Sequence, residues 1–284
     1  MANLLDIRRR IRSVKNTQQI TKAMKMVSTA KLRRAKERVL NARPYANEIM
    51  AVLNSLVMRT EKGTHPFLEE RSEHKVLVGV FTADKGLCGA FNANVIKAVQ
   101  AFMTEHRGKD IKLACVGRKG RDFFRRQGAP IVAERVNLTE LNYDLAKQIA
   151  GRLMEAYLDR TIDTVYLVYN EFKSVIQQRI VVERLLPIPQ LHTKHESHAV
   201  DYIYEQPAVE IINSLIPRYV EVQVLRALLE SSAAEHGARM TAMDAATNNA
   251  TDLIDSLTLT MNRARQAGIT KEIIEIVSGA AALE

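Results

Sequence analysis

The stretch IRRRIRSVKNTQQITKAMKMV, residues 7–27, lies in a segment that favours one long helix. Residues 1–62 contain no glycine and a single proline, Pro44, and they are rich in good helix formers such as Ala, Met, Lys and Arg. The apolar residues recur at mostly helical intervals: Ile7, Ile11, Val14, Met24, Val27, Val39, Ile49, Val52, Leu53 and Leu56. We predict a helix over residues 3–58, about 80 Å long, with Pro44 as a kink or a junction.

The positive charge of the chain is concentrated in this first segment. Residues 1–40 carry twelve Lys and Arg, among them Arg8 and Arg9, against two acids, so the segment is +10 in a chain of net charge +9. Few acids stand one helical turn from these cations to offset their mutual repulsion. We interpret this face as the binding site of an acidic protein surface, although charge alone leaves nucleic acid and anionic lipid open.

The middle of the chain, residues 74–190, alternates short β-rich runs with helical stretches. The predicted strands are 75–81, 111–116, 164–169 and 178–186, and the predicted helices lie near 92–105, 121–127 and 141–159. Such alternation predicts a small central α/β domain, Rossmann-like, with a mostly parallel sheet. The polar, His-rich residues 191–206 are expected to form a linker or a surface hairpin.

The helical pattern returns in residues 208–284. A helix over 218–277 would be about 90 Å long, interrupted only by Gly237 and Gly268, with Thr270 and Glu272 starting a short capped run after Gly268. Its predicted coiled-coil seam steps by three and four residues: Met243, Ala246, Ala250, Leu253, Leu257, Met261 and Ala264. We expect the two terminal helices, 1–62 and 208–284, to pair antiparallel as a rod, with the α/β domain as a knob clamped at one end.

Sites for chemistry are scarce. The sequence has neither G-x-x-x-x-G-K-[ST] nor G-x-G-x-x-G, so the usual phosphate cradles are missing. The turns at Gly86–Gly89 and Gly117–Gly120 are interpreted as ordinary strand-to-helix turns rather than anion sites, and Asp84 with Lys85 as a structural turn rather than a catalytic pair. No catalytic residue and no cofactor are therefore predicted.

The remaining reactive residue types also favour structural roles. Cys88 and Cys115 lie in apolar surroundings and are expected to be buried, reduced thiols, which suits a reducing compartment. The histidines His192, His195 and His198 are interpreted as solvated loop residues rather than metal ligands. No apolar run reaches the ~20 residues of a membrane span, and the N-terminus lacks the apolar core of a signal peptide.

The end of the chain carries a specific pattern. Residues 269–282 read ITKEIIEIVSGAAA, in which Thr270, Glu272, Glu275, Gly279 and Ala280 hold fixed spacings. Together with NTQQITKAMKMV at 16–27, DKGLCGAFN at 84–92 and EHGARMTAMDAATNNA at 235–250, this end resembles the gamma subunits of F-type ATP synthases. The resemblance covers essentially the whole chain in the same order.

This resemblance implies a non-catalytic central rotor shaft. Its two helices would turn inside a ring of three alpha and three beta subunits, where ATP is made or hydrolysed, and would couple them to a proton-driven membrane rotor ring (c-ring). The α/β domain and the lower coiled coil would bind the epsilon subunit and that ring.

The resemblance also implies partner-binding residues on the shaft. Arg265, Gln266 and Thr270 would form a catch that hydrogen-bonds a beta-subunit loop, while Met24 and Lys25, with the basic face of Arg8 and Arg9, would meet an acidic segment of beta. The inserted cysteine segment of photosynthetic forms is missing between Cys115 and Tyr202, so thiol control is not expected. The resemblance favours the bacterial type, peripheral on the cytoplasmic face of the plasma membrane, although mitochondrial chains are similar.

Two other classes stay open on the residues alone. A basic coiled-coil protein would bind nucleic acid with a steep salt dependence. An α/β enzyme would use the Asp84–Gly89 turn and bind or turn over nucleotide by itself, against which the missing phosphate motifs argue.

Overall fold

A computed structural model of the chain describes residues 4–58, 65–138, 140–175, 177–189 and 208–281. The chain divides into two compact units, one of Met1–Ser28 with Met240–Glu284 and one of Thr29–Arg239. The segment predicted as a linker or hairpin, 191–206, lies outside the described residues together with its three histidines.

The first helix matches its prediction closely. Helix α1 extends over Leu4–Met58 and contains Pro44, so the proline does not mark a junction. A proline inside a helix costs about 3 kcal/mol, whereas each large aliphatic side chain buried on the same helix contributes about 1.5–3 kcal/mol. The buried positions of α1 are spaced by three, four, seven or fourteen residues, as in a coiled coil: Ile7, Thr21, Ser28, Leu32, Ala35, Val39, Ala46, Ile49, Leu53 and Leu56.

The last helix is continuous. Helix α5 extends over Ala208–Ala281 without a break and contains Pro217. The predicted break at Gly268 and the predicted cap at Thr270 are wrong, because the hydroxyl of Thr270 donates back to the carbonyl of Gln266 at 2.9 Å, as in a helix interior. A glycine costs a helix only about 1 kcal/mol relative to alanine, which the helix formers on both sides of Gly268 offset.

The mostly parallel sheet is confirmed. Its five strands have the order β3-β2-β1-β4-β5, where β1 pairs parallel with β2 and β4, β2 pairs parallel with β3, and β4 pairs antiparallel with β5. The bounds are Lys75–Phe81 for β1, Asp110–Val116 for β2, Ile131–Arg135 for β3, Thr164–Phe172 for β4 and Gln178–Leu186 for β5. The sequence pattern missed β3, because this edge strand has no fully buried residue and hence no apolar run.

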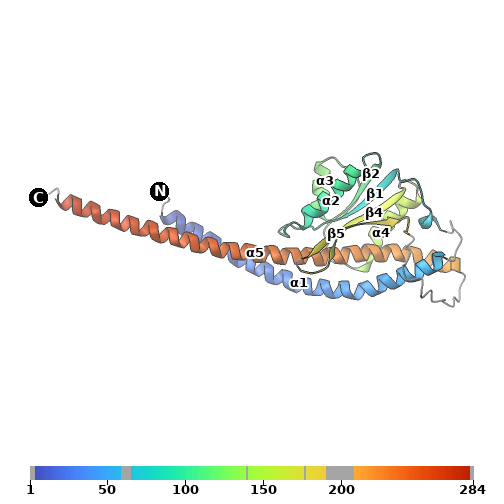
Figure 1. The fold of residues 1–284 in the computed structure, drawn as a ribbon, viewed down its shortest axis with the longest axis horizontal. Coiled ribbons are helices and arrows are strands. Elements are labelled where there is room, and N and C mark those ends of the chain that lie inside the picture. The colour runs from blue at the N-terminus through green and yellow to red at the C-terminus, as the bar shows by residue number, and fades with distance from the viewer. Residues whose placement is uncertain (1–3, 59–64, 139, 176, 190–207, 282–284) are drawn as a thin grey trace. The chain divides into compact units, whose positions relative to one another are not determined.

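Helices cover both faces of this sheet (Figure 1). Strand β1 alternates, with Leu77 and Phe81 in the core cluster that includes residues of α1 and α5, and with Val76, Val78 and Val80 in the opposite cluster. Helix α4, Tyr143–Leu158, lies on the first face, whereas α2, Phe91–Glu105, and α3, Arg118–Arg126, lie on the second. A short 3-10 helix, Pro66–Leu68, precedes β1.

Candidate functional site

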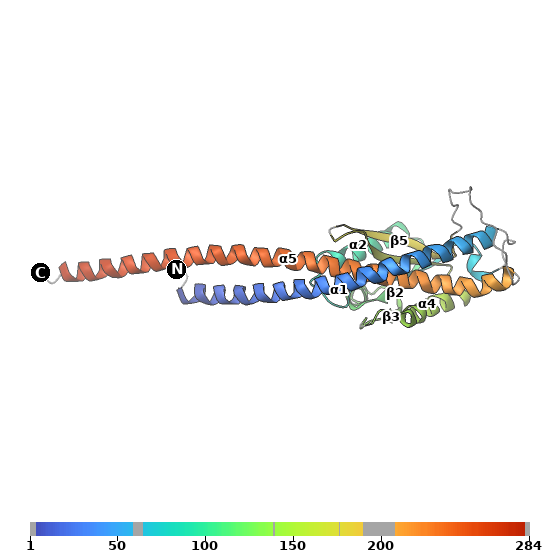
Figure 2. The ribbon, with the colours of Figure 1, turned by 90° about the horizontal axis from the view of Figure 1, so that it is seen from below.

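The two long helices pair through a polar seam in the unit that contains residues 4–28 of α1. Gln18 Nε2 donates to Thr251 Oγ1 at 2.7 Å, and the hydroxyls of Thr21 and Thr247 lie 2.8 Å apart. The higher-numbered residue of α1, Thr21, contacts the lower-numbered residue of α5, Thr247. The two helices therefore run antiparallel, as Figure 2 also shows. The sequence-based search missed these α5 partners, although the polar residues at successive seam positions of α1 are a usable signal.

Lys25 extends this seam. Its ammonium lies 2.5 Å from Asp244 Oδ1, and the two side chains are 42% and 48% exposed. The neighbouring Met24 is half-buried. The pair therefore leaves one side of Lys25 open to solvent while its charge is already matched within the chain.

The basic face of α1 stays largely exposed. Arg8 and Arg9 are exposed, and Arg9 Nη1 lies 3.9 Å from Asp6 Oδ1. Large apolar side chains are interleaved with the cations of the same helix, since Ile20, Met26 and Val27 are all more than half exposed. This face therefore combines exposed cations with exposed aliphatic groups.

The predicted seam of α5 shifts in detail. Met243 and Ala250 are buried as expected, but Leu253 is 47% exposed and Ile254 takes the inward position. The later predicted seam positions are again partly buried: Leu257, Met261 and Ala264.

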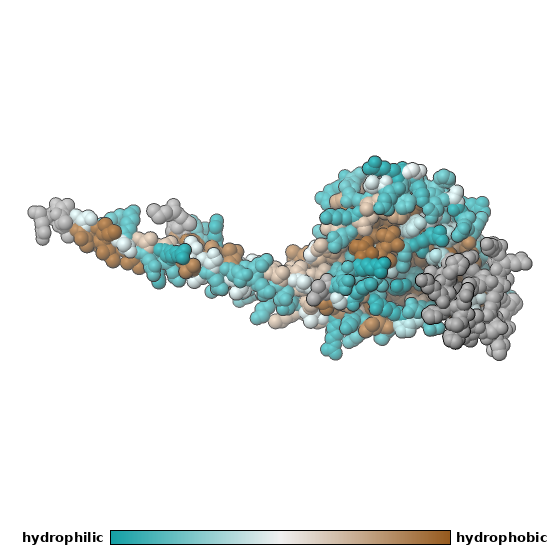
Figure 3. All heavy atoms as spheres, in the orientation of Figure 1, coloured by the Kyte–Doolittle hydropathy of each residue, from teal (hydrophilic) through white to brown (hydrophobic). Residues whose placement is uncertain are grey.

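The C-terminal turns of α5 continue past the start of α1 (Figure 2). Every residue from Ile269 to Ser278 is exposed, and Arg265 and Gln266 are exposed as well. Gln266 and Thr270 lie one turn apart on the same side of the helix, with Arg265 on the adjacent side. Apolar atoms are visible at this end of the helix in Figure 3. The exposed aliphatic residues of these turns are Ile269, Ile273, Ile274, Ile276 and Val277.

The carboxyl edge of the sheet is where an α/β domain would bind nucleotide. The first amides of α3 are the natural anion donors there, but they already bond to the loop that follows β1. Arg118 N donates to Asp84 Oδ1 at 2.9 Å, Lys119 N donates to the carbonyl of Ala83 at 3.0 Å, and Gly120 N donates to Thr82 Oγ1 at 2.9 Å.

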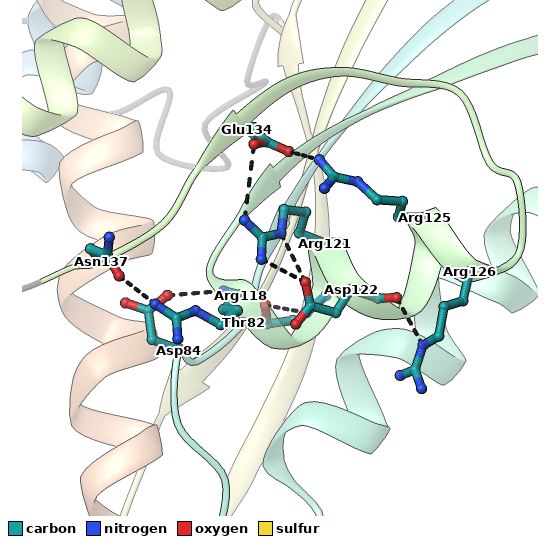
Figure 4. Close-up of polar contacts among 10 residues, drawn as sticks. Thr82, Asp84, Arg118, Arg121, Asp122, Arg125, Arg126, Glu134 and Asn137 are labelled. Atoms are coloured by element: carbon teal, nitrogen blue, oxygen red, sulfur yellow. Dashed lines mark hydrogen bonds and ion pairs between the residues drawn. The ribbon is translucent and has the colours of Figure 1, made fainter.

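Asp84 also contacts the loop that follows β3 (Figure 4). Its other carboxylate oxygen accepts from Leu138 N at 2.6 Å, and the Arg118 guanidinium donates to Asn137 Oδ1 at 2.5 Å. Asp84 therefore holds together the loops after β1, β2 and β3. The interpretation of Asp84 and of Gly117–Gly120 as structural turns agrees with these contacts.

The two cysteines are free and buried, as predicted. Burial raises the pKa of both thiols, and that of Cys115 rises to about 12, so neither forms a reactive thiolate near neutral pH. Within the described residues there is no group of His, Cys, Asp or Glu that could hold a metal ion. None of the helices in the described part of the chain is both long and apolar enough to cross a bilayer.

Known proteins match this chain along its whole length. The family model described as ATP synthase matches residues 3–283. The ATP synthase gamma chain of Solibacter usitatus is 53% identical over 289 residues, and that of Pelotomaculum thermopropionicum is 51% identical over 285 residues, each with 100% of both chains covered.

Solved structures agree. A chain of the central stalk and c-ring structure of the Tetrahymena thermophila mitochondrial ATP synthase is 30% identical with a TM-score of 0.65, covering 80% of this chain and 99% of that chain. A chain of the Euglena gracilis mitochondrial ATP synthase shares the fold at 20% identity, with a TM-score of 0.68 and coverage of 99% and 94%. Nothing among these matches supports a nucleic-acid-binding protein. With relatives of this identity over its full length, the chain belongs to the ATP synthase gamma chain family.

Proposed function

We propose that this chain is the central rotor shaft of an F-type ATP synthase, a non-catalytic subunit that couples rotation of a membrane ring to ATP synthesis or hydrolysis on alpha and beta subunits. The observation that carries this function is the antiparallel pair α1 and α5, in which the ten successive residues 269–278 of α5 are exposed. Exposed aliphatic side chains at a helix end are unfavourable in water, so a surrounding protein sleeve accounts for them.

The coupling is mechanical. An asymmetric shaft presents a different face to each of three beta subunits as it turns, and each face favours a different beta conformation. Only contacts that differ between those conformations can shift their populations. Exposed side chains of the two helices are the groups that can make such contacts with beta. The exposed arginines and aliphatic residues of α1 have this property.

The proposed contact residues follow from the resemblance to the gamma subunits. We assign Arg265, Gln266 and Thr270 to a catch that bonds a beta-subunit loop near the end of α5. The set Arg8, Arg9, Met24 and Lys25 is assigned to contacts with an acidic segment of beta. The exposure of Arg8, Arg9 and the three catch residues supports both assignments.

The wider assembly completes the proposal. One copy of this chain serves three alpha and three beta subunits, and the α/β domain over 74–190 with the adjoining helices binds an epsilon subunit and a proton-driven c-ring. The shaft segments are 1–62 and 208–284, joined to the domain in part by 191–206. The complex is placed on the cytoplasmic face of a bacterial plasma membrane, where this chain is peripheral.

Co-expression with alpha and beta subunits tests the function. We expect a complex with one copy of this chain per three alpha and three beta, which hydrolyses ATP while the chain alone does not. A chain that fails to co-purify with them, or that turns over nucleotide or binds nucleic acid tightly at physiological salt on its own, would refute the proposal.

The catch is tested separately. The double variant Arg265→Ala/Gln266→Ala is expected to weaken assembly or slow ATP turnover, because it removes both side chains while the helix keeps its propensity. Lys271→Ala is the matched control, because Lys271 is also an exposed cation of this helix but lies about 120–140° around the helix from Arg265 and Gln266. Equal assembly and turnover in the two variants would remove Arg265 and Gln266 from the contact set.

A further inference from the structure

One carboxylate in the larger unit is buried at the meeting point of three elements. The side chain of Glu230, on α5, is 1% exposed and accepts from Arg43 Nε of α1 at 2.8 Å. It also accepts from Arg43 Nη2 at 3.0 Å and from the backbone N–H of Phe172, at the end of β4, at 3.0 Å. Arg43 Nη2 donates in turn to the carbonyl of Phe172 at 2.9 Å.

These bonds form a closed bridge between the two long helices and the sheet. The guanidinium and the carboxylate meet in a bidentate, charge-assisted arrangement, which is strong and fixed in direction. The hydrogen bond to Glu230 raises the pKa of Arg43 above its ordinary value, so the arginine stays charged. A buried charge without its partner is costly, and the bridge leaves neither Arg43 nor Glu230 unmatched.

The rest of the contact between sheet and helices is mainly apolar. Leu167, Tyr169 and Leu185 of the sheet share one core cluster with Val220, Val224 and Leu228 of α5. Hydrophobic packing of this kind resists separation, but it has no preferred direction along the surface. A sheet held by apolar packing alone can therefore slide on the helices under a sideways force.

Directional bonds at the carboxyl edge of the sheet prevent such sliding. Besides the bridge, Gln178 Nε2 donates to the carbonyl of Ala234 at 3.0 Å, and Arg239 Nη2 donates to the carbonyl of Gly86 at 3.2 Å. Both of these contacts fasten the edge to α5. The bridge differs because Arg43 fastens α1 at the same point.

We infer that the bridge Arg43–Glu230–Phe172 is the joint that makes the α/β domain and both shaft helices turn as one body when the shaft rotates against a load. Arg43 and Glu230 are positioning residues, because they act on energy coupling through the geometry of the shaft. The inference rests on the proposed function, since a load exists only in the assembled rotary complex.

The test uses the complete ATP synthase in inverted membrane vesicles, with ATP hydrolysis and ATP-driven proton uptake measured on the same preparation. The double variant Arg43→Met/Glu230→Gln removes the charged joint and leaves no unpaired buried charge, while the glutamine keeps an acceptor for Phe172 N–H. We expect it to assemble and hydrolyse ATP, but to take up at least twofold fewer protons per ATP hydrolysed. Arg43→Lys keeps the positive charge but loses the bidentate geometry of the guanidinium. Its number of protons taken up per ATP hydrolysed should lie between those of the double variant and the wild type.

Arg71→Met is the matched control. Arg71 is a largely buried arginine that donates to the carbonyl of Tyr157 and pairs with Glu69, so these contacts involve neither α1 nor α5. We expect its proton-to-ATP ratio to equal that of the wild type. A proton-to-ATP ratio in the double variant equal to that of the wild type would refute the inference. An equal decrease of this ratio in Arg71→Met would refute it as well. Wild-type vesicles that show no ATP-driven uptake would instead refute the proposed function.

Discussion

Gly117, the residue between β2 and α3, has a backbone that only glycine adopts without strain, and we predict that Gly117→Ala strongly destabilises the α/β domain. Its φ of 101° and ψ of 142° cost a residue with a side chain about 1–3 kcal/mol. An added Cβ would also lie 2.0 Å from the carbonyl oxygen of Thr82, so the end of β1 would have to move.

That movement endangers the hydrogen bonds at the same edge. Gly120 N–H to Thr82 Oγ1 and Arg118 N–H to Asp84 both depend on the position of the loop after β1, and each contributes about 1 kcal/mol. The total loss in the free energy of unfolding is therefore expected to be about 3–5 kcal/mol.

Gly128→Ala is the matched control for this loss. Gly128 also has a positive φ, of 69°, but an added Cβ would have nothing within 4 Å, so it bears only the backbone cost of about 1–2 kcal/mol. Urea unfolding of the full chain, followed by the near-ultraviolet circular dichroism of the buried tyrosines Tyr157 and Tyr169, measures both variants. Equal losses in the two would refute the argument that the contact with Thr82 decides the cost.

Two further predictions concern charged groups. Burial, with Arg239 and Lys31 nearby, lowers the pKa of His236 from 6.5 to about 4, so the folded state binds this proton more weakly and stability is lost as pH falls from 6.5 toward 4. Between pH 7 and pH 5, the free energy of unfolding of His236→Gln should therefore decrease by about 1 kcal/mol less than that of the wild type, after allowance for partial exposure. Urea unfolding at the two pH values measures this, and equal decreases would contradict the prediction. For the half-exposed pair Lys25–Asp244, a double-mutant cycle with alanine should give a coupling below about 1 kcal/mol, and a value above about 2 kcal/mol would show that the pair is more shielded than its exposure indicates.

The long helices were predictable because their signals are local. Residues 4–58 lack glycine and repeat apolar side chains at helical spacing, and these properties need no knowledge of distant partners. The bounds of β1 and β5 agree with the prediction. For β1 the reason is that a continuously buried strand produces an apolar run. The family resemblance came from short motifs at both ends and in the middle, which the full-length relatives bear out.

Other features depended on tertiary contacts. Strand β3 is an exposed edge with little apolar content, so only its pairing with β2 reveals it. The continuity of α5 through Gly268 was missed because the local cost of glycine was weighed without the favourable residues around it.

The sequence by itself determined the helix pair, the α/β class, the basic face and the family, because periodicity, charge and motif spacing are properties of neighbouring residues. Tertiary structure alone decided the polar partners: Thr251, Thr247 and Asp244 for the α1 seam, the loop after β1 for the amides of α3, and Glu230 for Arg43. These partners are up to 233 residues apart in the chain. No local pattern encodes such a pairing, because it exists only once apolar burial has brought the helices and the sheet together.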